Sequence, residues 1–366
     1  MKVALVHDYI KEYGGAERVL ETLHEMYPNA DVFTTIYCPQ YLGPHRDRFS
    51  NWNIKTSFLQ QIPFKEKLIS PFRLISSWVF KNFDFSGYDL VIVSATGAYI
   101  PNALKKGTAR HVCYCHTPPR YLYGYKTARD WEKNKISKIV GSIVNHFLRM
   151  VDFQSARNVD LFIANSKEVK ERIWKFYRRD AVVVYPPVET QNLKVKSQNL
   201  KKNYYLTGGR LARAKRVDLA VEACTKLKTP LKVFGKSFAG YGDELKEIAG
   251  SNVEFVGEVA EEEKYSLMAG AKAFIFPSDT EDFGITPVES MMMGTPVIVY
   301  KSGGVLETVV EGKTGLFFEK LNVDSLIDAI KASERIEWNK EKIIKNAKRF
   351  SKERFIEDFQ RCIKTK

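Results

Sequence analysis

The stretch that decides the fold is Ala273-Phe-Ile-Phe-Pro277, followed by Glu281-Asp-Phe-Gly-Ile-Thr-Pro-Val-Glu289. The first five residues form an apolar run that predicts a buried strand, and a helix begins at about Thr286. Two carboxylates, Glu281 and Glu289, therefore lie at the carboxyl end of a strand and at the start of the following helix. In open α/β sheets ligands bind at this edge, and helix N-termini attract phosphate.

The same segment also has a purely structural interpretation. Thr286-Pro-Val-Glu289 fits a capping box, with Thr286 as the N-cap, Pro287 at the first helical position and Glu289 bonding back to the cap. The acidic residues between 279 and 282 would then form a solvated loop. The segment alone leaves both interpretations open, so a functional interpretation needs support from the rest of the chain.

The composition is that of a soluble globular protein with two domains. The chain has 366 residues, of which 44% are hydrophobic and 27% are charged. No apolar run approaches the ~20 residues that a membrane-spanning helix needs, and the first residues predict a strand, not a signal peptide. Five cysteines without a metal-binding spacing favour reduced thiols in a cytoplasmic protein.

The net charge of +14 predicts a negatively charged partner, such as a phosphorylated small molecule, a membrane surface or nucleic acid. Residues 101–150 carry 10 basic and 2 acidic side chains. The segment 51–83 interleaves aromatic and basic residues, which predicts amphipathic helices on a membrane surface; the alternative is an insertion packed on its domain with solvated lysines. Scattered basic residues without a nucleic-acid motif disfavour a non-catalytic nucleic-acid-binding protein.

Strand and helix signals alternate in both halves of the chain, which predicts βαβ units and parallel sheets. We expect domains over residues 1–187 and 204–340, a polar linker over 188–203, and a C-terminal helix over 341–366 that packs back toward the first domain. Two such domains imply a cleft between them, a common place for ligands. The expected strands are 3–7, 31–35, 89–94, 110–115 and 160–164 in the first half, and 204–207, 231–234, 253–256, 273–276 and 296–300 in the second.

Glycine loops follow several of these strands. In Thr207-Gly-Gly-Arg-Leu211, Gly209 lets the backbone approach a ligand, Arg210 offers a fork for phosphate, and Lys215 adds a point charge. Gly14-Gly15 opens a helix after the first strand, so its amides could face a phosphate or a sugar. Each loop by itself is also an ordinary strand-to-helix turn, and neither is a dinucleotide fingerprint or a P-loop.

A histidine follows another strand in His116-Thr-Pro-Pro-Arg120. That position suits hydrogen-bonding or acid-base work on a substrate, although a lone histidine in a turn is more often structural. Ser302-Gly-Gly-Val-Leu-Glu307 again places glycine amides at a helix start, and Ser166 is placed as an N-cap. His7 and Asp8 lack metal-binding partners at a recognisable spacing, so the sequence predicts no metal site.

Together these residues resemble the retaining glycosyltransferases of the GT-B fold, family four, also called glycosyltransferase group 1. Within that family, His116-Thr-Pro-Pro-Arg-Tyr-Leu and Lys215-Arg-Val-Asp-Leu are similar to the WbaZ-like mannosyltransferases. One departure is Arg216, where many members have glycine. The resemblance spans nearly the whole chain and rests on Gly14-Gly15, His116, Gly209-Arg210 with Lys215, Glu281 to Glu289, Gly294-Thr-Pro, and Gly303-Gly304 with Glu307.

The resemblance implies two Rossmann-like parallel-sheet domains facing across a cleft, the first for the acceptor and the second for the nucleotide sugar. It implies transfer, with retention, of α-mannose from GDP-mannose to a lipid-linked or oligosaccharide acceptor in surface polysaccharide or glycolipid assembly. A transferase using UDP-sugars and a sugar-nucleotide epimerase are the alternatives. No cofactor or essential metal is expected. The expected location is the cytoplasm, including the inner face of an anionic membrane.

The roles of individual residues follow from the same resemblance. Arg210 and Lys215 neutralise the diphosphate, which is the leaving group. Glu281 contacts sugar hydroxyls, and His116 hydrogen-bonds the donor sugar from the opposite domain. These four are the expected catalytic residues. Glu289 binds the ribose, and the other nucleotide-sugar contacts come from Gly15, Gly209, Phe283, Gly284, Ile285 and Thr286.

Overall fold

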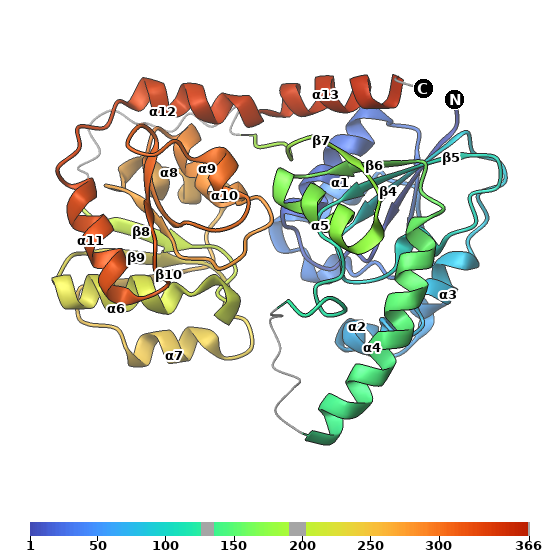
Figure 1. The fold of residues 1–366 in the computed structure, drawn as a ribbon, viewed down its shortest axis with the longest axis horizontal. Coiled ribbons are helices and arrows are strands. Elements are labelled where there is room, and N and C mark those ends of the chain that lie inside the picture. The colour runs from blue at the N-terminus through green and yellow to red at the C-terminus, as the bar shows by residue number, and fades with distance from the viewer. Residues whose placement is uncertain (126–134, 190–202, 365–366) are drawn as a thin grey trace. The chain divides into compact units, whose positions relative to one another are not determined.

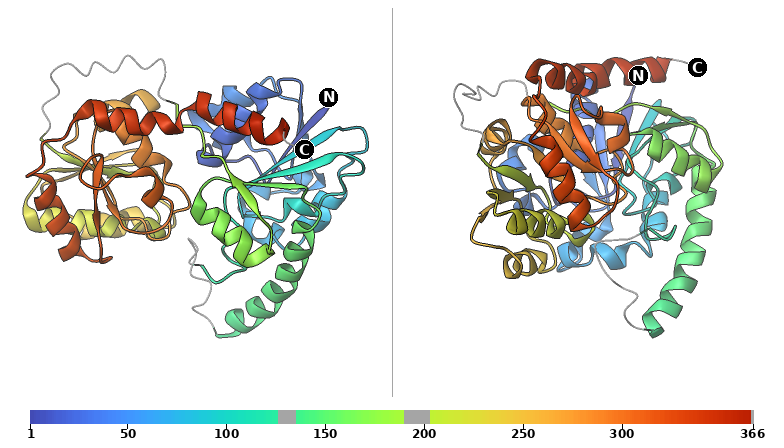
Figure 2. Two further views of the ribbon diagram at one scale, coloured as in Figure 1. Left: turned by 45° about the horizontal axis from the view of Figure 1, so that its top comes forward. Right: turned by 60° about the vertical axis from the view of Figure 1, so that its left-hand side comes forward.

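The computed structural model describes residues 1–125, 135–189 and 203–364. It divides into two compact units, which are drawn in Figures 1 and 2. Unit 1 consists of Met1–Pro187 together with Phe355–Lys366, and unit 2 of Val188–Arg354. Residues 190–202, most of the predicted linker, lie outside the described residues. Each unit is an α/β domain built on one parallel sheet, as the alternation of strands and helices predicted.

The sheet of unit 1 has seven parallel strands in the order β3-β2-β1-β4-β5-β6-β7. Its central strands are continuous apolar runs because helices cover both faces of a parallel sheet. The edge strands β3 and β7 were not predicted, since each is only partly buried and its apolar pattern is weak. The strands are β1 (Val3–His7), β2 (Asp31–Thr34), β3 (Ile54–Thr56), β4 (Leu90–Ala95), β5 (Arg110–Cys115), β6 (Leu161–Ala164) and β7 (Ala181–Val183).

The helices of unit 1 include α1, which opens at the Gly14-Gly15 turn, and α5, whose predicted N-cap is confirmed. Ser166 Oγ accepts a hydrogen bond from the Val169 amide at 3.1 Å.

The longest helix is α4, and within the described residues no helix is long and apolar enough to cross a membrane. The helices of this unit are α1 (Gly15–Met26), α2 (Ile69–Phe72), α3 (Ser76–Lys81), α4 (Lys135–Ala156), α5 (Lys167–Tyr177) and α13 (Lys352–Lys364).

The basic aromatic segment 51–83 folds as an insertion packed on unit 1. It holds β3, short 3-10 turns and the two short helices α2 and α3, which fits the predicted alternative of a packed insertion. Leu59, Phe72 and Phe80 are buried in the core beside the sheet. The aromatic residues are thus divided between the core and the surface, which neither of the two sequence-based interpretations had foreseen in full.

The sheet of unit 2 has six parallel strands in the order β10-β9-β8-β11-β12-β13. Strand β13 and helix α7 were not predicted. The strands are β8 (Tyr205–Gly208), β9 (Leu231–Phe234), β10 (Val253–Gly257), β11 (Phe274–Phe276), β12 (Val297–Tyr300) and β13 (Gly315–Phe318). The helices are α6 (Val217–Leu227), α7 (Tyr241–Glu247), α8 (Glu261–Gly270), α9 (Ile285–Met292), α10 (Val305–Thr308), α11 (Val323–Ser333) and α12 (Lys340–Ala347).

The C-terminal tail is two helices where one was predicted. Helix α12 packs on α9 in unit 2, and a 3-10 turn at Lys348–Phe350 separates it from α13. Helix α13 then carries Phe355 and Phe359 into the core of unit 1, where their rings lie 5.7 and 6.5 Å from that of Tyr114. The polypeptide therefore leaves unit 1 once and returns to it at its end.

Candidate functional site

The strand order of unit 2 reverses between β8 and β11, which are neighbours at the centre of the sheet. Connections from the two strands therefore lead to opposite sides, and the carboxyl edge between them is where open α/β sheets bind ligands. Gly209, Arg210 and Lys215 follow β8, whereas Ser278 and Glu281 follow β11. The topology thus places the three charged residues predicted from the sequence, Arg210, Lys215 and Glu281, at one edge of the sheet.

Lys215 and Glu281 form an ion pair at this edge. Lys215 ends the 3-10 turn η7 (Arg213–Lys215), and its Nζ lies 2.5 Å from Oε2 of Glu281. Ser278 Oγ donates a hydrogen bond to the same oxygen at 2.8 Å. The side chains of Lys215 and Glu281 are 30% and 17% exposed, so the ion pair is partly open to solvent.

The backbone of Glu281 is fixed by the glycine loop that follows β12. The Gly304 amide donates to the carbonyl oxygen of Glu281 at 2.8 Å, and Gly303 pairs with the same residue. A Cβ atom added to Gly303 would lie 2.3 Å from that carbonyl oxygen, and one added to Gly304 would lie 2.4 Å from the carbonyl oxygen of Asp282. Glycine permits this close approach, so the Gly303-Gly304 pair positions the Glu281 loop.

The interpretation of Thr286 as an N-cap is wrong. Helix α9 begins at Ile285, and its N-cap is Gly284 with φ of 87°, a left-handed conformation that glycine adopts without strain. Within the described part of the chain no side chain caps this helix. The amides of its first turn therefore have no partner inside the helix, as in a helix end that binds an anion.

Phe283 and Glu289 are both buried. Phe283 is buried, with its ring edge-on to that of Phe350 at 5.4 Å, so any contact it makes with a ligand comes from its backbone. Glu289 is also buried, and its Oε1 accepts hydrogen bonds from Lys264 Nζ at 2.8 Å and Tyr265 Oη at 3.2 Å. The carboxylate therefore faces α8, where the capping interpretation had it bond to the helix start.

Arg210 lies on the loop of Lys215 but makes different contacts. Its guanidinium group is exposed, with its central carbon 6.0 Å from the ring centre of Phe238. The neighbouring Gly209 amide donates to the carbonyl oxygen of Phe234 at 3.1 Å, which holds the base of the loop against β9. Arg210 is thus on the predicted loop, and its long side chain is exposed to solvent.

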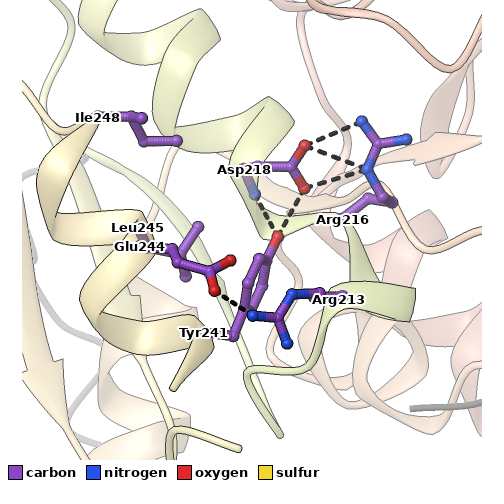
Figure 3. A pocket seen from close by; sticks show the side chains of 7 residues that line it. All are labelled: Arg213, Arg216, Asp218, Tyr241, Glu244, Leu245 and Ile248. Atoms are coloured by element: carbon purple, nitrogen blue, oxygen red, sulfur yellow. Dashed lines mark hydrogen bonds and ion pairs between the residues drawn. The ribbon is translucent and has the colours of Figure 1, made fainter. Parts of the chain in front are cut away.

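A pocket of about 330 Å³ opens between η7, α6 and α7 (Figure 3). Arg213 pairs with Glu244 there, and Arg216 pairs with Asp218 at 2.9 Å. Two arginines pair with two carboxylates, so the pocket has no excess positive charge and is a poor site for an anion. The ion pairs connect η7 to α6 and α7. The residues that line the pocket are Arg213, Arg216, Asp218, Tyr241, Glu244, Leu245 and Ile248.

In unit 1 the strand order reverses between β1 and β4, and His116 lies close to this point. Its Nε2 is 2.9 Å from Oγ of Ser94, a residue of β4. Burial, together with the nearby charge of His7, lowers the pKa of His116 to about 3, so the ring is neutral at pH 7.

The predicted glycine turn of unit 1 lies at the start of α1. Gly15 begins α1, and the amide of Gly14 donates to Glu17 Oε2 at 2.9 Å.

Sequence reasoning missed several of these polar neighbours. Ser94 lies near the end of the apolar strand β4, and Ser278 follows the apolar strand β11. Both strands lie where the strand order of their sheet reverses, and a serine at the end of an apolar run can be recognised in the sequence. Lys264 and Tyr265 carry no such signal, since they lie on a separate helix and reach Glu289 only through packing. Among residues 1–125, 135–189 and 203–364, no three His, Cys, Asp or Glu side chains gather as they would around a metal ion.

Two family models match the chain one after the other. The model described as Glycosyltransferase Family 4 matches residues 13–192, and the model described as Glycosyl transferases group 1 matches residues 188–350. Together they cover the sheets of both units, apart from β1, and every residue of the site in unit 2.

Curated relatives are similar to the chain at low identity. The alpha-1,3/1,6-mannosyltransferase ALG2 of Kluyveromyces lactis is 26% identical over 415 aligned positions, which cover 93% of this chain and 76% of the relative. The ALG2 protein of Dictyostelium discoideum is 26% identical over 279 positions, covering 63% of this chain and 64% of the relative. The chain therefore spans less than two thirds of the length of the second relative.

Solved structures share the fold of the whole chain. Sucrose-phosphate synthase from Thermosynechococcus elongatus has a TM-score of 0.72 at 17% identity, with 99% of this chain and 98% of that chain covered. Anabaena HepE, solved in complex with UDP and glucose, has a TM-score of 0.69 at 19% identity with full coverage of both chains. These likenesses show the GT-B fold, two Rossmann-like domains in one chain.

The left-handed backbone of Arg216, with φ of 50°, leads to a prediction about stability. Arg216→Ala keeps this conformation, which costs about 1–2 kcal/mol for a residue with a Cβ atom, and loses the ion pair with Asp218. Arg216→Gly loses the same ion pair but relieves the strain. We expect the glycine variant to be more stable than the alanine variant by about 1 kcal/mol, measured by urea denaturation. An alanine variant that equals the glycine variant in stability would contradict this account.

Proposed function

Because the chain belongs to the glycosyltransferases of family four, the group 1 transferases, we propose that it is a retaining mannosyltransferase. The donor is GDP-mannose, and the acceptor is a lipid-linked or oligosaccharide chain in surface polysaccharide or glycolipid assembly. The observation that carries the proposal is the Lys215–Glu281 ion pair beside the uncapped start of α9. The curated ALG2 relatives, named as mannosyltransferases, support the choice of mannose.

The chemistry of transfer explains why these groups are needed together. Breaking the anomeric bond puts negative charge on the leaving diphosphate, and fixed cations and amides stabilise that charge. In the proposal, Lys215 moves from Glu281 to the diphosphate, Arg210 turns from the surface onto the same phosphates, and the α9 amides bind the phosphate and the sugar. Glu281 is then released to bind sugar hydroxyls.

The remaining roles complete the proposed donor site. Glu289 binds the ribose hydroxyls, and His116 hydrogen-bonds the sugar as a neutral imidazole. The leaving phosphate itself helps to remove the proton of the acceptor hydroxyl, so no protein carboxylate has to act as the base. The proposal also assigns Gly15 and Gly209 to the nucleotide sugar, through their backbone amides.

The donor can be identified by thermal shift and calorimetry with GDP, GDP-mannose, UDP and UDP-sugars. We expect GDP and GDP-mannose to stabilise the protein selectively, and Lys215→Ala to abolish that effect and to lower the transfer rate about 10²–10³-fold. The matched control is Lys272→Ala, which removes a lysine paired with Glu334 at 3.2 Å elsewhere in unit 2 and is expected to bind normally.

Selective binding of UDP-linked donors would overturn mannose but keep the transferase. That alternative is favoured by one observation, the likeness to HepE, which was solved with UDP and glucose. Release of free nucleotide together with a longer acceptor distinguishes transfer from epimerisation of the nucleotide sugar. Absence of any nucleotide binding would contradict the proposed site.

We further propose that transfer needs no metal ion, because Arg210 and Lys215 supply the positive charge at the diphosphate. The expected result is that activity after dialysis against EDTA equals that of the untreated protein. Added magnesium or manganese is expected to change the rate little. Loss of activity in EDTA that returns with a divalent cation would show that the two side chains are insufficient.

A membrane-bound acceptor calls for a surface that docks to lipid, and unit 1 offers one in two parts. In the basic aromatic segment 51–83, the side chains of Phe64 and Trp78 are 69% and 55% exposed, and Lys65 and Lys67 follow Phe64 in the sequence. The second part, the α4 stripe, is an exposed row on one face of that helix with spacings of three and four residues. It consists of Ile139, Ile143, Phe147 and Met150.

These two parts are connected through Tyr121. The guanidinium group of Arg73, in the segment 51–83, lies 4.7 Å from the ring centre of Tyr121, and Asn145 of α4 donates to the carbonyl oxygen of Tyr121. Exposed apolar side chains beside basic ones match an anionic membrane, which takes up apolar groups and attracts cations. We propose docking at the cytoplasmic face of such a membrane.

The docking surface can be tested by flotation with vesicles of phosphatidylglycerol and of phosphatidylcholine. We expect binding to the anionic vesicles that weakens with salt, and its loss in the double variant Phe64→Glu with Phe147→Glu. The control is Trp174→Glu, which changes an equally exposed aromatic residue on α5 (57% exposed). Weak binding to both kinds of vesicle without dependence on salt, or unchanged binding of the double variant, would refute the docking surface.

A further inference from the structure

Four polar side chains form a line across the carboxyl edge of the sheet in unit 1. The line runs from Glu17 on α1 through His7 at the end of β1 and Ser94 in β4 to His116 after β5. His7 and Ser94 are fully buried, and Glu17 is 6% exposed. Buried polar groups destabilise a fold unless they are hydrogen-bonded, so three of them in one line point to a use beyond packing.

The distances along the line allow each group to act on the next. Oε1 of Glu17 lies 3.5 Å from Nε2 of His7, an ionic contact when the imidazole is protonated. His7 Nδ1 lies 3.1 Å from Ser94 Oγ, and Ser94 Oγ lies 2.9 Å from His116 Nε2. The register of the sheet creates this geometry, since His7 and Ser94 are directly paired in adjacent parallel strands.

The single hydroxyl proton of Ser94 sets the direction of this line. A serine between two imidazoles donates to one ring and accepts from the other. The carboxylate of Glu17 only accepts, so it favours a proton on Nε2 of His7 and a lone pair on His7 Nδ1. Ser94 then donates to His7 and accepts from Nε2–H of His116, which leaves a lone pair on Nδ1 of His116.

We propose that His7 and Ser94 are positioning residues that hold His116 in one tautomer, with Nε2 protonated and Nδ1 presented to a hydroxyl group of the substrate. Fixing which ring nitrogen bears the proton is a common use of a second hydrogen-bonding partner of a histidine. This inference deepens the proposed function, since it rests on contact between His116 and a sugar. The amide of Gly14, bonded to Glu17, connects the glycine turn to the same line.

The tautomer can be measured without substrate by NMR of the protein labelled with ¹⁵N in its histidine rings. The His116 signals are assigned with His116→Gln. We expect the wild-type shifts to be those of the Nε2–H form, Ser94→Ala to show a mixture of the two forms, and Ser94→Thr to restore the wild-type pattern. The matched control is Ser76→Ala, which removes another fully buried hydroxyl of unit 1. A wild-type Nδ1–H form, or a Ser94→Ala spectrum like that of the wild type, would overturn the proposal.

Kinetics supply a second arm that rests on transferase activity. We expect Ser94→Ala to lower kcat about 10- to 100-fold with little change in donor KM, as a misplaced reacting group does, and Ser94→Thr to recover most of the loss. If wild-type protein transfers no sugar, the proposed function fails, and the NMR comparison still decides the positioning role.

Discussion

The ion pair between Lys215 and Glu281 holds the candidate site of unit 2 together. It connects the loop after β8 with the loop after β11, the two strands at which the sheet reverses direction. The backbone of Glu281 is in turn fixed by Gly303-Gly304 after β12. Three loops from three adjacent strands are thus held by one carboxylate residue, through its side chain and its main chain, and α9 begins immediately beyond it at Ile285.

In unit 1, polar side chains also gather where the strand order of the sheet reverses, but they are of a different kind. Its strands reverse between β1 and β4, and this point carries the hydrogen-bonded groups His7, Ser94 and His116, with Glu17 3.5 Å from His7, where unit 2 carries an ion pair. The difference suits the two tasks proposed for them. A developing negative charge calls for cations and amides, whereas orienting a sugar hydroxyl calls for a neutral group with a defined donor and acceptor.

Much of the fold could be predicted because its strands are buried on both faces. Strands of a parallel sheet are continuous apolar runs, and runs such as Val3–His7 and Ala273–Phe276 can therefore be recognised in the sequence. The order of strands and helices then indicates two Rossmann-like domains. The misses were local. The edge strands β3 and β13 are only partly buried, so their apolar pattern is weak, and Thr286 was mistaken for an N-cap because Gly284 takes that place in a left-handed conformation.

The sequence by itself determined the fold class, the glycine loops and the charged residues that follow the strands, because each of these is encoded in a few adjacent residues. Only the tertiary structure decided which groups meet. Lys215 and Glu281 are 66 residues apart and follow two strands, β8 and β11, that pair in the assembled sheet. Ser94 contacts two histidines, 87 residues before it and 22 residues after it. Such contacts depend on register and on packing between strands, which are properties of the assembled sheet and not of any one segment.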